Sequence, residues 1–289
     1  MLRRSSRIRR SAEFVTSDPA PAMAASARAS YGERMARTDF RTPRLYVEAP
    51  LAEGAEVKLD PNQANYLVNV LRLGADARVL LFNGRDGEFA AALATTSRKS
   101  ASLIVGRRTR PQEAPPNVDY LFAPLKHARL DYMAQKAVEM GARRLRPLIT
   151  RRTQAARVNL ERLRANAIEA CEQCGVIWVP EVAALETLEK TLAHWPRGRL
   201  LVFCDEEAPE ASPLDALAEA SAENGVGLLV GPEGGFDDDE RAAILGAPRV
   251  LRLSLGPRIL RADTAAVAAL ALIQATLGDW PKRRRSDRL

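Results

Sequence analysis

From Val118 to Leu277 the sequence alternates short apolar segments with amphipathic helices, a pattern that few folds accommodate. Continuous apolar strands of this kind are typical of a parallel sheet covered on both faces. The pattern therefore predicts a doubly wound α/β domain. The expected strands are Val118–Ala123, Leu145–Ile149, Leu200–Cys204, Gly227–Val230 and Val250–Leu253, and the expected helices are Leu130–Met140, Leu160–Cys174, Pro213–Glu223, Asp238–Leu245 and Thr264–Leu277.

Residues 44–110 show a different pattern, with five short apolar or β-branched runs and one helix. The helix, Asn62–Leu73, follows Asp60-Pro61, and Pro is favoured in a first helical turn. The pattern predicts a small β-barrel domain, joined by a Pro-rich linker at 111–117 to an α/β domain at 118–281. The expected strands are Arg44–Ala49, Glu56–Leu59, Arg78–Phe82, Glu88–Ala94 and Ser102–Arg107.

The two ends of the chain hold most of its basic charge. The whole chain carries +7, with +6 in residues 1–44 and +4 in residues 282–289, so residues 45–281 carry −3. Net charge is therefore weak evidence for a nucleic-acid partner. The composition of residues 1–43 fits an organelle transit peptide, a disordered basic arm, or codons upstream of a true start at Met35. We expect a non-structural extension there and a basic tail at 282–289.

One internal segment is strongly basic, with eight arginines between residues 143 and 164 and a single acid, Glu161. Guanidinium groups pair with two phosphate oxygens at once, so such a cluster suits RNA. A solvated helix face with a polar loop is the alternative interpretation. The lack of nearby acids favours RNA.

Cys171 and Cys174 raise the question of a metal or redox site. They lie at helical spacing, and neither His127 nor His194 is placed to complete a zinc site. We expect reduced thiols in a cytoplasmic protein and no metal. The longest apolar stretch, Ala265–Ile273, is too short to cross a bilayer, so we expect no membrane association.

Two glycine-containing loops follow expected strands, and ligands of open α/β sheets bind at the carboxyl ends of strands. The first loop is Gly231-Pro232-Glu233-Gly234-Gly235-Phe236, after which Asp237 and Glu240 can form a capping box. The second is Leu255-Gly256-Pro257-Arg258-Ile259-Leu260-Arg261, and Asp263 is the expected N-cap of the last helix. Neither matches the glycine fingerprints of dinucleotide or nucleotide-triphosphate sites.

Together these two loops resemble the signature pair of the RsmE-type 16S ribosomal RNA uracil-N3 methyltransferases. The resemblance extends in order over about Arg44 to Leu277, through further similar segments. These are Arg44-Leu45-Tyr46-Val47, Tyr66-Leu67-Val68-Asn69-Val70-Leu71-Arg72, Lys136-Ala137-Val138-Glu139-Met140-Gly141 and Glu169-Ala170-Cys171-Glu172-Gln173-Cys174-Gly175. Two departures stand out: Asp263 replaces the family's usual Glu, and Val176 replaces an Arg that often follows the last motif.

The resemblance implies more than the pattern of strands and helices can. It implies an α/β domain of the SPOUT class, with a trefoil-knotted C-terminal chain, and an N-terminal barrel similar to PUA-type RNA-binding domains. It implies S-adenosylmethionine as the cofactor and N3 of a specific uridine in 16S ribosomal RNA of the 30S subunit as the methyl acceptor. It also implies a homodimer through the knotted domain, consistent with a last helix that is apolar almost all round.

The resemblance also assigns roles to residues. Arg261 is the candidate for stabilising the uracil anion or holding phosphate, and Glu172 is a candidate base or orienting residue. The candidate RNA-binding residues are Arg44, Arg72, Arg151, Arg152 and Arg157. The candidate cofactor-binding residues are Leu229, Gly231, Pro232, Glu233, Gly234, Gly235, Leu253, Leu255, Gly256, Arg258, Ile259, Leu260, Thr264 and Ala265.

Three other functions stay open from the sequence alone. The first is another SPOUT enzyme, such as a ribose 2′-O-methyltransferase, although the Asn-rich C-terminal loop associated with that family is missing. The second is a non-catalytic RNA-binding or ribosome-assembly factor that retains the cofactor pocket. The third is a dinucleotide-dependent enzyme, which the sequence of the glycine loops disfavours.

Overall fold

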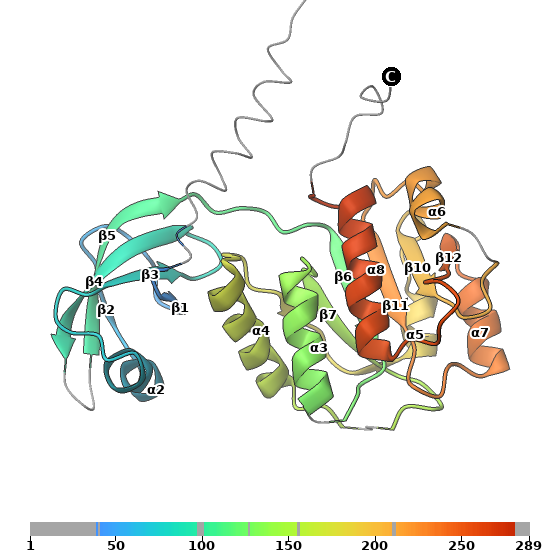
Figure 1. The fold of residues 1–289 in the computed structure, drawn as a ribbon, viewed down its shortest axis with the longest axis horizontal. Coiled ribbons are helices and arrows are strands. Elements are labelled where there is room, and N and C mark those ends of the chain that lie inside the picture. Colours follow the sequence, from blue (N-terminus) through green and yellow to red (C-terminus); the bar gives the residue numbers. More distant parts are fainter. Residues whose placement is uncertain are drawn as a thin grey trace, which may run out of the picture. The chain divides into compact units, whose positions relative to one another are not determined.

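The computed structural model describes residues 39, 41–96, 101–126, 128–154, 157–209 and 212–280. The basic tail predicted at 282–289 and most of the extension predicted at 1–43 lie outside these residues. Two sheets organise the described chain, one before residue 111 and one after residue 117 (Figure 1). The helices of the described chain include none that is long and apolar enough to cross a membrane.

The N-terminal sheet has five strands in the order β1-β3-β4-β5-β2. β1 pairs with β3 in parallel, and the other neighbours are antiparallel. Its core combines alternate strand residues with Ala64 and Leu67 from the helical segment. The elements are β1 (Arg44–Tyr46), β2 (Glu56–Lys58), α2 (Pro61–Asn65), η1 (Tyr66–Val70), β3 (Arg78–Phe82), β4 (Glu88–Thr96) and β5 (Ala101–Arg110).

The helix expected at Asn62–Leu73 is present but ends at Val70, and only its first turn is α-helical. Asp60 caps α2 in a capping box with Gln63, whose side chain also donates to Tyr46 O over 2.8 Å. The chain then widens into the π-helical turn η1, closed by Leu71 N–H donating to Tyr66 O. Local sequence therefore specified where this helix begins, but not its change of pitch.

The second sheet is wholly parallel, in the order β12-β10-β11-β6-β7-β8, with β9 also pairing with β7. Its strands are β6 (Val118–Phe122), β7 (Arg144–Ile149), β8 (Glu181–Val182), β9 (Glu186–Thr187), β10 (Leu200–Cys204), β11 (Val226–Val230) and β12 (Val250–Leu253). Its helices are α3 (Ala128–Glu139), α4 (Leu160–Cys174), α5 (Leu188–Ala193), α6 (Pro213–Glu219), α7 (Asp238–Leu245) and α8 (Ala262–Thr276).

Successive residues of these strands enter different cores on the two faces of the sheet. Tyr120 and Phe122 pack in the cluster that contains α3, α4, α6 and α8 residues, whereas Leu121 packs with α5 and α7 residues. Burial on both faces explains why the strands read as continuous apolar runs. The predicted α/β architecture is confirmed, although β8, β9 and α5 were too short to be predicted.

The predicted N-cap of the last helix was wrong. Helix α8 begins at Ala262 with Arg261 at the N-cap position, and no side chain caps it. Asp263 instead lies inside the first turn, where its carboxylate accepts two hydrogen bonds from Arg129, each 3.1 Å long. A strong charged partner on another helix therefore outweighs a local capping preference.

The two halves of the described chain meet through a buried ionic cluster around Glu88 on β4. Its carboxylate contacts Arg44 Nε at 2.8 Å and Arg110 Nη2 at 2.9 Å, and the Glu88 and Arg44 side chains are each only 2% exposed. Arg110 also donates to Gly175 O over 2.8 Å, at the end of α4. Burial raises the pKa of Glu88, but hydrogen bonds from Arg110 and Arg44 outweigh it and leave the pKa below its usual value.

Glu88→Gln is expected to lower the free energy of unfolding by about 3 kcal/mol at neutral pH, because it leaves buried cations uncompensated. A carboxyl whose pKa is lowered on folding stabilises above its unfolded pKa, and this stability is lost as pH falls through the folded value. Urea denaturation across a range of pH should therefore show that the free energies of unfolding of the wild type and of Glu88→Gln converge at acidic pH. Glu53→Gln, at an exposed position, is the control, and an equally small effect of both substitutions at neutral pH would show that the Glu88 cluster does not stabilise the fold.

Candidate active site

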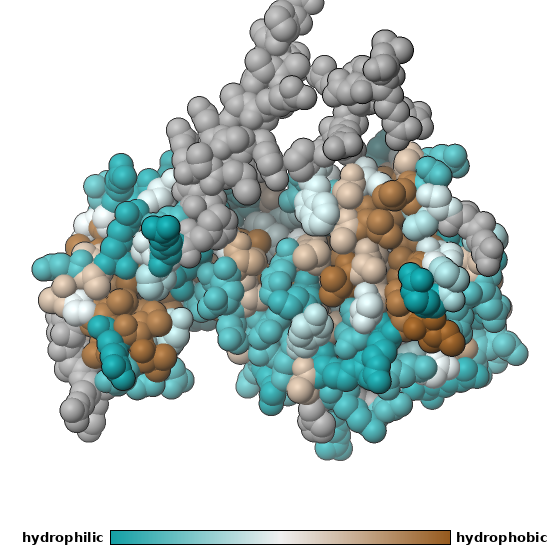
Figure 2. All heavy atoms as spheres, in the orientation of Figure 1, coloured by the Kyte–Doolittle hydropathy of each residue, from teal (hydrophilic) through white to brown (hydrophobic). Residues whose placement is uncertain are grey.

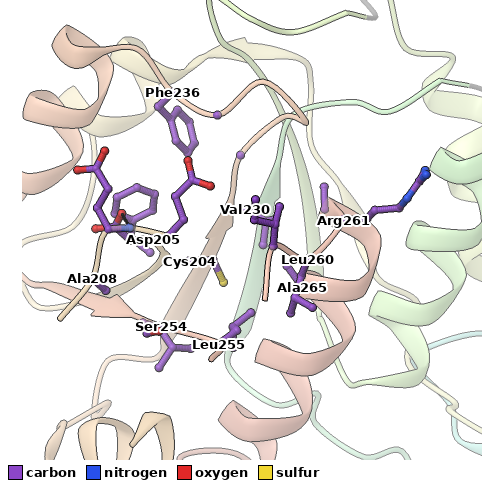
Figure 3. A pocket seen from close by; sticks show the side chains of 18 of the residues that line it. Cys204, Asp205, Ala208, Val230, Phe236, Ser254, Leu255, Leu260, Arg261 and Ala265 are labelled. Atoms are coloured by element: carbon purple, nitrogen blue, oxygen red, sulfur yellow. Dashed lines mark hydrogen bonds between the residues drawn. The ribbon is translucent and has the colours of Figure 1, made fainter. Parts of the chain in front are cut away.

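A cavity of about 1120 Å³ lies at the carboxyl ends of β10, β11 and β12 (Figure 3). Three segments provide most of its wall: 203–208 after β10, 230–236 after β11, and 253–262 after β12. The two glycine loops that are separate in sequence therefore line one cavity. This follows from strand order, because β10 pairs with both β11 and β12 in parallel.

Glycine is required in both loops for different reasons. A Cβ at Gly231 would lie 2.7 Å from the Phe236 ring, so the first loop can fold back only without a side chain there. Gly256 has φ +96°, which other residues rarely adopt. The first loop ends in the predicted capping box, in which Asp237 accepts from Glu240 N and Glu240 accepts from Asp237 N.

Most of the candidate cofactor-binding residues line this cavity, with two exceptions. Leu229 is 1% exposed and packs in the core behind β11, and Thr264 on α8 is exposed outside the cavity. Ile259 is 94% exposed, so it projects from the loop into solvent. The residues that do line it are Gly231, Pro232, Glu233, Gly234, Gly235, Leu253, Leu255, Gly256, Arg258, Ile259, Leu260 and Ala265.

Sequence reasoning missed the third wall, which follows β10. Asp205 is 3% exposed, and its Oδ2 accepts from Arg252 Nε at 2.6 Å and from Arg241 Nη2 at 2.9 Å. Burial raises the pKa of Asp205, but hydrogen bonds from Arg241 and Arg252 leave it below its usual value. This carboxylate therefore joins β10, α7 and β12 at the cavity. The acids directly after the predicted strand Leu200–Cys204 were the available signal.

Arg129, at the start of α3, ties together the two segments behind the cavity. Its guanidinium is bonded to Glu233 of the first glycine loop and to Asp263 in the first turn of α8. Hydrogen bonds from Arg129 lower the pKa of Asp263 and keep that carboxyl ionised. The shorter acid that replaces the family's usual Glu thus still makes a two-bond ion pair here. No local pattern in the sequence predicts this ion pair.

The arginine cluster does not form one free basic surface. Most of its members are paired with acids or carbonyls from distant segments: Arg143 with Asp119, Arg144 with Glu181, Arg146 with Glu186, Arg151 with Asp237 and Asp239, Arg152 with Gly234 O, and Arg162 with Asp131. Absence of acids in the local sequence was therefore a misleading sign. Exposed Arg157 and Arg164 have no ion pair among the described residues.

The candidate RNA-binding residues differ in exposure and in the bonds that their side chains make. The prediction for Arg44 needs correction, because its buried ion pair with Glu88 leaves its side chain 2% exposed and unable to reach phosphate. Arg151 and Arg152 are exposed but hold the first glycine loop and the start of α7. Arg72, with φ 55°, and Arg157 are exposed.

The two candidate catalytic residues lie in different places. Arg261 lines the cavity, although Figure 3 shows its side chain directed away from the other lining residues. Glu172 on α4 is not among the residues that line the cavity of this chain. Its Oε1 accepts from Tyr46 N at 2.9 Å, and burial raises its pKa to about 7. Glu172 therefore cannot act as a base at this cavity unless a second chain presents it.

The thiols belong to the packing of the domain. Cys171, Cys174 and Cys204 are free, and burial raises the pKa of Cys204 to about 12. Within the described ranges, no group of three or more His, Cys, Asp or Glu side chains is arranged to hold a metal ion.

Comparison with known proteins assigns the chain to a class. Residues 112–274 match the family model of the RNA methyltransferase domain, and residues 59–106 match that of the RNA methyltransferase PUA domain. An α/β domain with a cavity at its strand ends, preceded by a PUA domain, defines an RNA methyltransferase of this class.

The relatives are named more specifically. The chain is 30% identical over 232 residues to Ribosomal RNA small subunit methyltransferase E of Rickettsia conorii, covering 80% of this chain and 94% of that protein. It is 31% identical to the Synechocystis protein of the same name, and the match covers 81% of this chain and 78% of that protein. A Neisseria gonorrhoeae structure of that name, bound to S-adenosyl methionine, superposes with TM-score 0.74 at 28% identity. The superposition covers 83% of this chain and 100% of that chain.

The chain belongs to the ribosomal RNA small subunit methyltransferase E family. The family resemblance inferred from the two glycine loops is thereby confirmed. The PUA assignment of the N-terminal domain is also confirmed, because the matched residues 59–106 contain α2, η1, β3, β4 and part of β5.

Arg129→Ala is expected to loosen the first glycine loop and the start of α8 together, because both lose their shared cation. Hydrogen–deuterium exchange should show several-fold faster exchange at 232–235 and 263–266, with little change in the core of β6 and β11. Arg197→Ala, which removes another exposed arginine of the same domain, is the control. Unchanged exchange at both segments would show that Arg129 does not hold them.

Proposed function

We propose that this protein transfers a methyl group from S-adenosylmethionine to N3 of a uridine in 16S ribosomal RNA of the 30S subunit. The observation that carries the proposal is the single cavity shared by the two glycine loops. The names of the relatives and the S-adenosyl methionine bound in the gonococcal structure support it. The cytoplasm, where small subunits assemble, is the corresponding proposed location.

The composition of the cavity suits this cofactor. Its wall includes five acids and three arginines, an excess of negative charge that favours a ligand with sulfonium and ammonium groups. The acids Glu206, Glu207 and Asp238 lie on the β10 and α7 side. Apolar Val230, Leu255, Leu260 and Ala265 provide a surface for an aromatic ring.

In the proposed binding mode, the backbone at Gly234, Gly235 and Gly256 lets a ligand approach closely, because no side chain intervenes. When bound, S-adenosylmethionine supplies an already activated methyl group, so the chain's own task is to position donor and acceptor and to exclude water.

Proton removal is the other chemical requirement. Neutral N3 of uracil carries a proton and has no free in-plane lone pair, so the proton must pass to a base before the N3–methyl bond forms and the sulfur–methyl bond breaks. A cation beside O2 or O4 stabilises the resulting uracil anion. Arg261 is our candidate, because it belongs to the cavity wall and its side chain makes no hydrogen bond or ion pair within the described part of the chain. N3 lies on the Watson–Crick edge, so the uridine must be unpaired or flipped out.

We also propose a homodimer formed through α8 and the trefoil knot expected for the SPOUT class. Val267, Ala268, Ala271 and Leu272 form a partly buried apolar strip on α8, and Figure 2 shows hydrophobic surface in this part of the domain. Such a strip is a common feature of subunit interfaces. In a dimer, one subunit's N-terminal domain could present RNA to the cavity of the other.

The function is tested in cells and in solution. Deleting the gene should remove a single N3-methyluridine from 16S ribosomal RNA, mapped by reverse transcription and mass spectrometry, and the wild-type gene should restore it. Calorimetry with S-adenosylmethionine should show one site per chain. Absence of binding, with an unchanged modification map, would favour a non-catalytic assembly factor and end the proposal.

Arg261→Ala is expected to preserve affinity for S-adenosylmethionine within about twofold while lowering kcat at least 100-fold, the scale of losing one charge-stabilising donor. Calorimetry and methyl transfer to 30S particles from the deletion strain measure the two quantities. Arg197→Ala is the control. Unchanged turnover would remove Arg261 from the catalytic residues.

A further inference from the structure

A second, smaller pocket lies beside the first glycine loop and adjoins the cavity described above. Its volume is about 150 Å³, and it is lined by Pro124, Leu125, Lys126, Arg129, Gln154, Pro232 and Glu233. Pro232 and Glu233 line both spaces, so the two adjoin at the first glycine loop. Neither Lys126 nor Gln154 is among the site residues predicted from the sequence.

The wall of this smaller pocket combines apolar and polar groups. Pro124 and Leu125 are buried, and with Pro232 they present apolar surface. Arg129 and Glu233 are already ion-paired with each other, and Arg129 also with Asp263. Lys126 and Gln154 are exposed and make no side-chain hydrogen bond or ion pair within the described parts of the chain. They are the polar groups of the wall that remain available to a ligand.

The size of this pocket restricts its ligand. Pockets for whole small molecules or cofactors occupy about 300–1,000 Å³, so this one suits a fragment such as a single nucleobase. Enzymes that modify a flipped base hold it between apolar side chains and bind its polar edge with hydrogen bonds. A position adjoining the proposed donor cavity is where the acceptor base is required.

We propose that this pocket takes the acceptor pyrimidine, and that Lys126 and the Gln154 amide donate hydrogen bonds to its carbonyl oxygens. Two donors fit uracil, which has carbonyl oxygens on both sides of N3. Cytosine fits less well, because an amino group replaces one of these oxygens and would face a donor. The inference rests on the proposed function, because it assigns the acceptor of the same methyl transfer.

Removing the donor at Gln154, or replacing it with an anionic acceptor, provides a sharp test. Gln154→Ala removes a donor, whereas Gln154→Glu places an acceptor against a carbonyl oxygen. We expect kcat with 30S particles from the deletion strain to fall about tenfold for Gln154→Ala and further for Gln154→Glu. Lys126→Ala should lower kcat by a similar factor. Lys126→Arg should lower kcat less, because it keeps a cationic donor. A purely structural role would not produce this ordering.

Calorimetry with S-adenosylmethionine separates this inference from the function on which it rests. The variants should keep the wild-type Kd within about twofold, and Lys190→Ala on α5 should match the wild type throughout. Wild-type turnover in Gln154→Glu, or loss of S-adenosylmethionine affinity in step with turnover, would overturn the acceptor-pocket assignment while leaving the methyltransferase intact. A wild-type protein that binds no S-adenosylmethionine would instead overturn the proposed function itself.

Discussion

The parallel pairing of β10 with both β11 and β12 is the constraint on which the site depends. In a parallel sheet, the carboxyl ends of neighbouring strands lie at one edge, so the loops that follow them adjoin without any local signal. Asp205 reinforces this arrangement by binding Arg241 and Arg252, and these three residues come from the β10 loop, α7 and β12. A buried carboxylate with two cationic partners is costly to displace, which favours a preformed cavity.

In the described α/β domain, arginine serves more as a structural connector than as a free basic surface. Arg129 joins the first glycine loop to α8, Arg152 donates to a carbonyl of that loop, and Arg151 binds acids at the start of α7. The guanidinium group suits this use because it has several donors in a fixed plane. Three of the six residues in this loop are glycines, which have no side chain to pack, and these bonds from outside compensate for that lack.

The PUA domain and the α/β domain are likewise connected by ionic and backbone contacts. Glu88 binds Arg44 and Arg110, Arg110 reaches the carbonyl that ends α4, and Glu172 accepts from the backbone of β1. Two residues that resemblance associated with RNA or catalysis, Arg44 and Glu172, thus take part in this contact. Their hydrogen bonds and ion pairs help to hold the N-terminal sheet against helix α4 of the α/β domain.

The sequence by itself determined the parallel α/β sheet, the five strands before it, the α2 and α7 capping boxes and the two glycine loops. Each is specified by short-range information: apolar periodicity, a capping residue, or a backbone that only glycine adopts at position 256. Only the tertiary structure decided that acids far along the chain pair with most of the arginine cluster, that Asp263 pairs with Arg129 rather than capping α8, and that 203–208 completes the cavity. These outcomes depend on which strands become neighbours, because a charge at the surface is satisfied by whatever the fold brings within a few ångströms of it.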